Sequence, residues 1–206
     1  MTPRQQIAAM DMATIAGVDE TGRGCLAGPV YAAAVILPPK HGLRGLDDSK
    51  KLTAAEREKL VPKIQRRALA WAVGVASLEE IERLNILHAA LLAMQRAVEA
   101  LAVAPAAIRV DGTFSPKVTC PAETIVGGDA KVTSIMAASI LAKVARDDEM
   151  RRWHGEYPEY SFHTNKGYGT PEHLQALQVR GPCAIHRRLF GPVAQMSLQL
   201  VMEGED

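Results

Sequence analysis

Apolar residues come in short blocks separated by polar and glycine-rich stretches. Residues 14–20 (TIAGVDE) and 29–37 (PVYAAAVIL) are apolar runs typical of strands, and the sequence TGRGCLAG between them predicts a hairpin with an unusual connection. We expect a third strand over residues 71–77 (WAVGVAS). Two later apolar runs, 106–111 and 123–129, each end in an aspartate at a glycine-containing turn, which predicts buried strands with acids at their carboxyl ends.

Helical periodicity appears in the intervals between these strands. Residues 53–68 begin at Thr53 with Glu56 three residues later, which is the pattern of a capping box. The same pattern at Ser77 and Glu80 begins a stretch in which apolar residues recur every three or four positions. This stretch predicts one long amphipathic helix that ends near residue 102.

A further helix is predicted from about residue 132 to 152. Beside its apolar stripe runs a second face on which a hydroxyl, two cations and an acid line up: Ser139, Lys143, Arg146 and Asp147. After it come loop residues and a short helix from about residue 171. The C-terminal portion of the chain is therefore expected to be helical.

Composition agrees with this order of elements. The chain has 206 residues, of which 48% are hydrophobic and 23% charged, so it can bury a core of its own and intrinsic disorder is excluded. Only 4% of the residues are aromatic, so the core must consist of Ala, Val, Ile and Leu. We predict an α/β fold in a single domain over residues 1–206, with a core at about 13–195 and a helical segment from about 155.

The charge of the chain indicates a nucleic-acid partner in one segment only. Lys and Arg (24) against Asp and Glu (23) leave a net charge of +1, so no polyanion-binding surface covers the whole protein. Residues 160–192 contain four basic residues, among them Arg187, and one acid. This segment is the candidate contact with nucleic acid.

The cysteines and the hydropathy of the sequence indicate in which cellular compartment the protein lies. The three cysteines, Cys25, Cys120 and Cys183, form no C-x-x-C pair, so neither a disulfide framework nor a zinc site is indicated. The sequence shows neither a signal-peptide hydrophobic region nor a run of about 18 apolar residues. We therefore expect a cytoplasmic protein that makes no membrane contact.

Acidic residues follow three of the predicted strands, at Asp19–Glu20, Asp111 and Asp129. Ligands gather at the carboxyl ends of strands in open α/β sheets, and Mg²⁺ and Mn²⁺ prefer carboxylate oxygens. Paired cations of this kind stabilise the attacking and leaving oxygens in phosphodiester hydrolysis. Spacing alone leaves a second interpretation open, in which these acids are turn or helix-cap residues. Adjacent carboxylates on a regular strand also point to opposite faces, so the first pair serves one site only if the strand ends or kinks there.

Six sequence blocks resemble the ribonuclease HII family, in the same order and at compatible spacing. They are GVDETGRGCLAGPV (17–30), DDSK (47–50), VDG (110–112), GGDAKVTSIMAASILAKVARDDEM (127–150), HTNKGYGT (163–170) followed by His173, and IHRRLFGPV (185–193). The resemblance extends over about residues 15–195. It implies a ribonuclease H-like fold, with a mixed central sheet flanked by helices and a helical C-terminal portion that helps to grip the substrate.

The resemblance also implies an activity. Members of the family cleave RNA within RNA/DNA hybrids and nick duplex DNA at the 5′ side of embedded ribonucleotides, using Mg²⁺ or Mn²⁺ and leaving a 5′-phosphate and a 3′-hydroxyl. Their catalytic, metal-binding acids match Asp19, Glu20, Asp111 and Asp129, which are the acids selected above by their positions after strands. The expected partners are therefore RNA/DNA hybrids and ribonucleotide-containing duplex DNA.

Substrate contacts follow from the same resemblance. The family turn that senses the ribonucleotide matches Gly22, Arg23 and Gly24, and these glycines permit the close backbone approach that reading a 2′-hydroxyl requires. Tyr168 matches a tyrosine that packs against the deoxyribose after the scissile phosphate. Phosphate contacts are expected from four further residues, Lys50, Ser139, Lys143 and Arg146. The histidines show no metal-ligand spacing, and we assign them no role.

Two other functions stay open on the sequence. One is a resolvase-like carboxylate nuclease of the same fold, and the other is a non-catalytic module that binds hybrids. A duplex with one ribonucleotide distinguishes the resolvase-like nuclease, because only a ribonuclease HII is expected to make a unique nick at the 5′ side of the ribonucleotide. Mg²⁺-dependent turnover distinguishes the binding module, because that module would bind without cleaving. Residues 195–206 lack the aromatic pair found in sliding-clamp peptides, and we expect a monomer.

Overall fold

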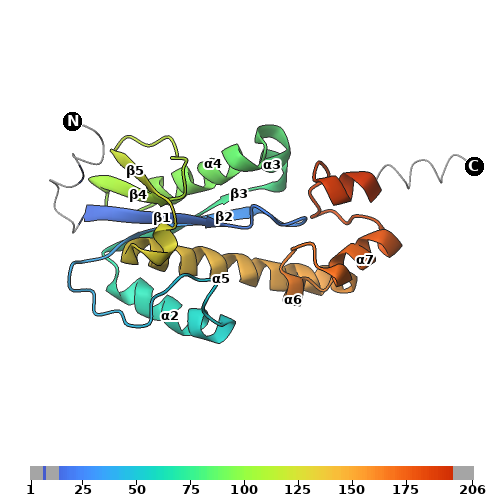
Figure 1. Ribbon diagram of the computed structural model, residues 1–206, viewed down its shortest axis with the longest axis horizontal. Coiled ribbons are helices and arrows are strands. Elements are labelled where there is room, and N and C mark those ends of the chain that lie inside the picture. Colours follow the sequence, from blue (N-terminus) through green and yellow to red (C-terminus); the bar gives the residue numbers. More distant parts are fainter. Residues whose placement is uncertain (1–6, 8–13, 197–206) are drawn as a thin grey trace, which may run out of the picture.

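The structure is a computed structural model that describes Ile7 and residues 14–196. Residues 1–6, 8–13 and 197–206 lie outside this part, and so does most of the C-terminal stretch on which the monomer expectation rests. A central sheet has helices on both faces, and a smaller helical group lies beyond one end of the sheet (Figure 1). The predicted α/β class with a helical C-terminal portion is confirmed.

The sheet has five strands in the order β3-β2-β1-β4-β5. Their bounds are β1 Ile15–Thr21, β2 Val30–Ile36, β3 Ala70–Ala76, β4 Ala107–Asp111 and β5 Ala122–Ile125. The first three strands pair antiparallel, as the hairpin pattern predicts, whereas β4 runs parallel to both β1 and β5. The sheet is therefore mixed, and β1 is its central strand.

Two layers of helices cover the sheet (Figure 1). Helices α3 (Leu78–Leu84) and α4 (Ile86–Glu99) lie on one face, and α2 (Ala54–Arg67) and α5 (Thr133–Glu156) lie on the other. The shorter segments are η2 (Gly128–Ala130), η3 (Pro158–Tyr160), α6 (Phe162–Asn165), α7 (Pro171–Arg180) and a last helical turn at residues 191–196. Among the described helices, none combines the length and the apolar character needed to cross a membrane.

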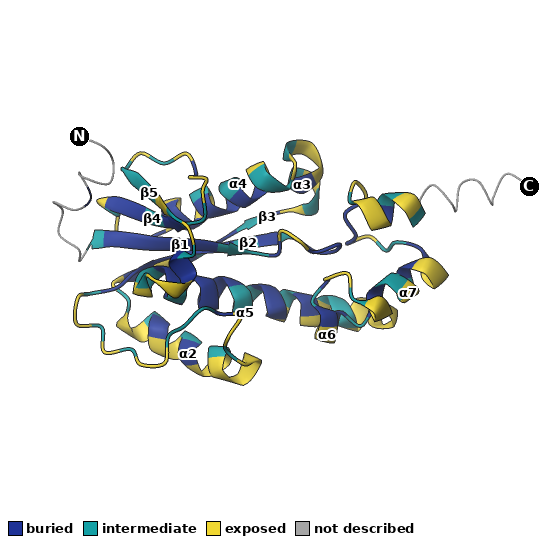
Figure 2. Cartoon of the chain, in the orientation of Figure 1, coloured by how far each residue is buried: buried dark blue, intermediate teal, exposed yellow. Residues whose placement is uncertain are grey.

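Alternate residues of the strands supply one core on each face of the sheet. In β2, Ala32 belongs to the cluster that packs against α4, whereas Ala33 belongs to the cluster with α2 and α5. Figure 2 shows the resulting buried strands between helices whose outer faces are exposed. Close packing of α5 requires a glycine in β1, because a Cβ on Gly17 would lie 2.2 Å from the carbonyl carbon of Ser134.

A third apolar cluster joins the C-terminal helices to the loop between β1 and β2. Its buried members are Leu26, Ala27, Met150, Tyr160, Phe162, Leu177, Ile185 and Val193. An isolated antiparallel bridge also pairs Ala27 with His186. The loop that follows β1 is therefore held by the C-terminal part of the chain as well as by the sheet.

Both predicted capping boxes are present, at Thr53 and at Ser77. The single long helix predicted from Ser77 to residue 102 is wrong, because Asn85 divides it into α3 and α4. The backbone of Asn85 has a positive φ of 67°, and its side chain accepts hydrogen bonds from the N–H groups of Leu87 and His88. This backbone conformation interrupts the helix, and the side chain of Asn85 caps the second helix, so the apolar spacing continues while the helix does not.

The predicted buried strand at 123–129 is also corrected. The strand β5 ends at Ile125, and its residues are half-buried or exposed because it forms an edge of the sheet. Asp129 lies in the 3₁₀ turn η2, which follows the strand. The acid is thus presented by a turn between β5 and α5 and not by a strand end.

Candidate metal and nucleic-acid site

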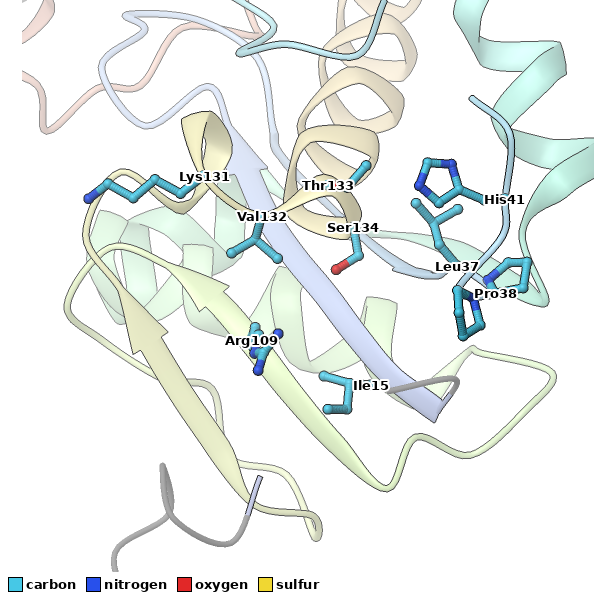
Figure 3. A pocket seen from close by; sticks show the side chains of 10 residues that line it. Ile15, Leu37, Pro38, His41, Arg109, Lys131, Val132, Thr133 and Ser134 are labelled. Carbon is cyan, nitrogen blue, oxygen red and sulfur yellow. The ribbon is translucent and has the colours of Figure 1, made fainter. Parts of the chain in front are cut away.

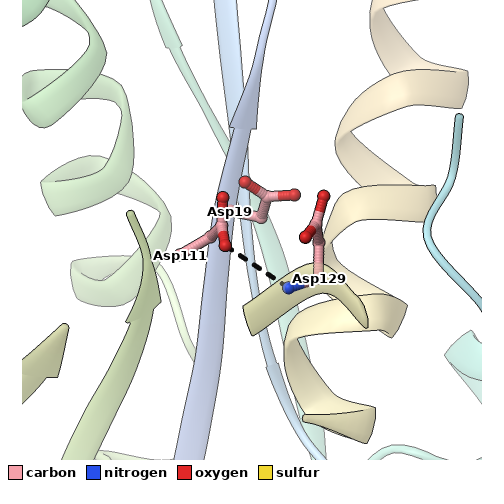
Figure 4. A group of neighbouring side chains, drawn as sticks. All are labelled: Asp19, Asp111 and Asp129. Carbon is pink, nitrogen blue, oxygen red and sulfur yellow. Dashed lines mark hydrogen bonds between the residues drawn. The ribbon is translucent and has the colours of Figure 1, made fainter. Parts of the chain in front are cut away.

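Three aspartates meet at the carboxyl end of β1. Asp19, Asp111 and Asp129 each offer a carboxylate oxygen within 4.8 Å of the others (Figure 4). Asp19 and Asp129 are buried, with exposed fractions of 4% and 6%, and Asp111 is half-buried. Acids from three distant parts of the sequence therefore share one small volume.

Strand pairing and a turn bring the three acids together. Val18 of β1 lies opposite Val110 of β4 in a parallel register, so the next residues, Asp19 and Asp111, end at the same edge of the sheet. Asp111 Oδ1 then accepts the backbone N–H of Gly128 at 2.7 Å and that of Asp129 at 3.3 Å. These bonds orient one carboxylate and fix the turn that carries another.

The acid cluster holds more negative charge than its protein neighbours balance. Burial raises the pKa of Asp19 well above its usual value, and the charges of Glu20 and Asp111 raise it further. The cation beside the cluster is Lys50, whose Nζ lies 3.1 Å from Asp129 Oδ2. Clustered oxygen donors with excess negative charge suit a hard divalent cation, so the residues fit Mg²⁺ or Mn²⁺.

Glu20 is not part of the 4.8 Å group of aspartates, although it lines the same cavity as Asp19 and Asp111. The strand β1 stays extended through Thr21 and neither ends nor kinks at the acidic pair, so the two adjacent carboxylates face opposite sides of the sheet. Glu20 Oε1 pairs with Arg23 Nη1 at 3.2 Å, and Glu20 lines a hollow beside Leu87 of α4. Burial raises the pKa of Glu20, and Arg23 opposes this increase.

An open cavity of about 490 Å³ joins the acids to the predicted substrate residues. The residues that line it are Asp19, Glu20, Thr21, Gly22, Arg23, Gly24, Lys50, Ile86, Asp111 and Tyr168. The cavity therefore brings together three of the four predicted acids, the Gly-Arg-Gly turn, one predicted phosphate contact and the predicted tyrosine. The fourth acid, Asp129, adjoins it through Lys50 and through the cluster with Asp19 and Asp111. Lys143 borders this group, since its Nζ lies 5.7 Å from the centre of the Tyr168 ring.

The loop that carries Lys50 is held in place by side chains of α2 and α5. Ser49 is buried, and its Oγ is 2.7 Å from Ser139 Oγ on α5. Arg57 of α2 donates from Nη1 to the carbonyl oxygen of Ser49 at 2.7 Å. Ser139 is 5% exposed, and its hydroxyl supports the lysine loop and the acid cluster, so a direct contact of Ser139 with a phosphate stays a prediction.

The predicted phosphate contact of Arg146 is wrong. Its side chain is fully buried, and its guanidinium donates to the carbonyl oxygens of Pro29, Lys166 and Ala27. A phosphate cannot reach a group enclosed by three backbone carbonyls. The predicted surface face of α5 is covered here by the loop between β1 and β2 and by the segment around Lys166, and helical periodicity does not reveal these contacts.

The sequence also gave no role to Arg187 beyond its share in a basic segment. Arg187 is 1% exposed, so it is removed from that predicted nucleic-acid surface. It hydrogen-bonds the backbone of the turn that contains Gly22 and Arg23. The signal that could have identified it is its position in IHRRLFGPV, one of the six blocks that resemble the family.

A second cavity lies at the opposite end of β1 (Figure 3). It has a volume of about 300 Å³, and its lining includes Ile15, His41, Arg109 and Ser134. No carboxylate belongs to that lining among the described residues. The cavity is therefore separate from the acid cluster and shares none of its chemistry.

A mixed five-stranded sheet with carboxylates at the end of its central strand defines the divalent-metal-dependent nucleases of the ribonuclease H-like fold. Comparison with known proteins agrees, because the family model described as Ribonuclease HII matches residues 16–193. The chain belongs to the ribonuclease HII family. It is therefore an endonuclease of the ribonuclease H type.

Individual relatives are similar over most of their length. A ribonuclease HII of Cupriavidus necator is 57% identical over 198 residues, which cover 95% of this chain and 83% of the relative. One from Bordetella pertussis is 57% identical over 181 residues, which cover 88% of this chain and 90% of the relative. The crystal structure of ribonuclease H2 from Pyrococcus horikoshii has a TM-score of 0.77 at 26% identity and covers 91% of this chain and 98% of its own.

Proposed function

We propose that this protein hydrolyses the RNA strand of RNA/DNA hybrids and nicks duplex DNA at the 5′ side of embedded ribonucleotides, leaving 5′-phosphate and 3′-hydroxyl ends. The observation that carries the proposal is the meeting of Asp19, Asp111 and Asp129 within 4.8 Å, beside a cavity that Asp19 and Asp111 share with the Gly-Arg-Gly turn. The relatives named ribonuclease HII support the substrate class.

Asp19, Asp111 and Asp129 would hold Mg²⁺ or Mn²⁺, and Glu20 lines the cavity that Asp19 and Asp111 share. Such cations, when bound, supply Lewis-acid stabilisation of the charge that develops on phosphate oxygens. The chain itself fixes its ligands beforehand, because two backbone N–H groups hold the carboxylate of Asp111. Lys50 balances part of the charge at Asp129 until substrate arrives.

Recognition of the substrate uses three features around the acids. The backbone of Gly22, Arg23 and Gly24 contacts the ribonucleotide, and the 40% exposed ring of Tyr168 packs against the sugar that follows the scissile phosphate. Lys50 and Lys143 contact phosphates, which set affinity and register without reading sequence.

The active unit is one copy of the chain, acting as a single catalytic domain over residues 1–206 with its core at about 13–195. Its compartment is the cytoplasm. The three cysteines, Cys25, Cys120 and Cys183, are all free, which supports a reducing environment.

One labelled duplex with a single ribonucleotide tests the proposal. With Mg²⁺ or Mn²⁺ we expect one nick at the 5′ side of the ribonucleotide, and with chelator we expect none. Asp19→Asn and Asp111→Asn should each lower turnover by about a thousandfold or more while binding to the duplex persists. Asp148→Asn removes an exposed acid of α5 and should cleave like the wild type.

The alternatives give different results in this assay. A resolvase-like nuclease would cleave without regard to the ribonucleotide, and a binding module would bind the duplex without turnover. Wild-type turnover by both aspartate variants would refute the assigned acids.

A further inference from the structure

Arg187 is a buried guanidinium without an acidic partner. Its side chain is 1% exposed, and among the described residues it forms no ion pair with a carboxylate. Burial lowers the pKa of Arg187 to about 10, so the group remains a cation at neutral pH. A buried cation is costly unless its donors are satisfied, and here backbone carbonyl oxygens satisfy them.

The carbonyls that Arg187 binds come from both ends of one loop. Nη1 donates to Arg23 at 2.9 Å, and Nη2 donates to Gly22 at 2.6 Å and to Gly28 at 2.8 Å. Nε also donates to the carbonyl oxygen of Gly28, at 3.0 Å. The planar fork of one arginine thus spans the loop that follows β1, which the point charge of a lysine cannot do.

These bonds determine the direction of two peptide groups. No described peptide bond is cis, and in a trans peptide the C=O and the N–H point in opposite directions. Arg187 draws the carbonyls of Gly22 and Arg23 inward, so the N–H groups in the same two peptide planes, those of Arg23 and Gly24, point away from the arginine.

Both N–H groups are available for a ligand. Neither donates a hydrogen bond in the described part of the chain, although both residues line the cavity that contains the acids. The space outside the turn is open, since a Cβ on Gly24 would meet no atom within 4 Å. The guanidinium also polarises the two peptides, which strengthens their N–H groups as donors.

We propose that Arg187 is a positioning residue that sets the discrimination between ribonucleotide and deoxyribonucleotide, because it holds the N–H groups of Arg23 and Gly24 toward the 2′-hydroxyl. The inference rests on the proposed function, in which this turn contacts the ribonucleotide. Arg187 itself touches no substrate, since backbone carbonyls enclose its guanidinium.

The test is a comparison of two affinities in one protein. The KM for a duplex with one ribonucleotide is compared with the inhibition constant of the same duplex made entirely of DNA. Arg187→Lys keeps the charge but not the fork, and it should reduce the preference for the ribonucleotide about tenfold, which corresponds to one lost hydrogen bond between neutral groups. Affinity for the all-DNA duplex should stay within about twofold, since its phosphate contacts are intact.

Arg188→Gln is the matched control. It removes a cation one residue further along, at an exposed position, and should leave the preference unchanged. An Arg187→Lys protein that keeps the wild-type preference would overturn the inference. A wild-type protein without any preference would instead overturn the proposed function, so the two failures are distinguishable.

Loss of the buried arginine could also unfold the protein, which thermal melting would reveal. In that case amide hydrogen exchange of the wild-type protein tests the inference. The N–H groups of Arg23 and Gly24 should exchange quickly in the free protein and slowly with the ribonucleotide duplex, but not with the all-DNA duplex. Slow exchange of both in the free protein, or no protection by the ribonucleotide, would overturn the inference.

Discussion

His173 and His186 hydrogen-bond to each other through their Nε2 atoms, which lie 2.9 Å apart between two buried rings. Nδ1 of His186 accepts the N–H of Cys183 at 2.9 Å, so the proton of this ring lies on Nε2 and is donated to His173. His173 then donates from Nδ1 to the carbonyl oxygen of Tyr168 at 2.8 Å. Both rings are neutral in this arrangement, which ends on the loop that carries the predicted substrate tyrosine.

The neutral pair predicts a loss of stability in mild acid. Burial, and then the neighbouring His173, lowers the pKa of His186 from 6.5 to about 4. Below pH 6.5 His186 binds a proton in the unfolded chain but stays neutral in the folded chain. Its contribution to the free energy of unfolding is therefore complete above pH 6.5 and is lost as the pH falls toward 4. Between pH 7 and pH 5 the free energy of unfolding should fall by about 2 kcal/mol from this residue. Urea denaturation at the two pH values measures it.

His186→Gln should show a correspondingly smaller fall than the wild type. His88→Gln replaces an exposed histidine of α4 and should keep the full fall. Asp19 and Glu20, whose pKa values are raised, contribute the opposite slope, but equally in all three proteins. Equal falls in the wild type and the His186 variant would contradict the neutral pair.

Asn85 should be the residue that holds the boundary between α3 and α4. Asn85→Ala removes the cap of α4 and opposes the positive φ, so we expect a loss of about 2 kcal/mol in the free energy of unfolding. Asn85→Gly also loses the side-chain cap, but it permits the positive φ without strain, so it should be clearly more stable than the alanine variant. The alanine variant should have the lowest urea midpoint of the three proteins, and an alanine variant as stable as the wild type would contradict this assignment.

Removal of divalent cations should reverse the stability effect of one acid. In chelator, Asp19→Asn relieves the repulsion within the acid cluster and should stabilise the protein by about 1 kcal/mol. Added Mg²⁺ or Mn²⁺ should raise the melting temperature of the wild type but not that of the variant, because a ligand that binds only the folded state stabilises it. Equal cation-induced shifts in both proteins would argue against Asp19 as a ligand.

Tyr168 should act through its ring. Its face meets Lys143 and the open cavity, so Tyr168→Ala should lower kcat/KM on the single-ribonucleotide duplex by about 10- to 100-fold, the range of one stacking contact. Tyr168→Phe keeps the ring and should stay within about threefold of the wild type. A large defect in the phenylalanine variant would shift the role from the ring to the hydroxyl.

The sequence predicted the elements of the fold better than their burial. Periodicity and capping patterns identified β1 to β4, α2 and the start of α5, because these signals are local. The cluster of Asp19 and Asp111 was also predictable, since parallel strands end at one edge of a sheet. The division between α3 and α4 at Asn85 was not predicted, because the apolar spacing continues through it without a change.

The burial of individual side chains was not predicted, because it depends on contacts with distant parts of the chain. Arg146 shares a helix face with Lys143, and periodicity alone makes both surface cations. The structure covers Arg146 with the carbonyls of Ala27 and Pro29, more than 100 residues earlier in the sequence, and leaves Lys143 beside the cavity. A pattern shows which residues lie on one face, but only tertiary contacts decide whether that face meets water.

The parallel pairing of β1 with β4 also governs when the enzyme can first act during its own synthesis. Asp19 leaves the ribosome early, and the strands β2 and β3 that follow it carry no other acid of the cluster. Asp111 and Asp129 follow on the far side of α4, and only their arrival beside β1 completes the set. A translation product that stops before residue 107 is therefore incapable of cutting nucleic acid, whatever part of it has folded.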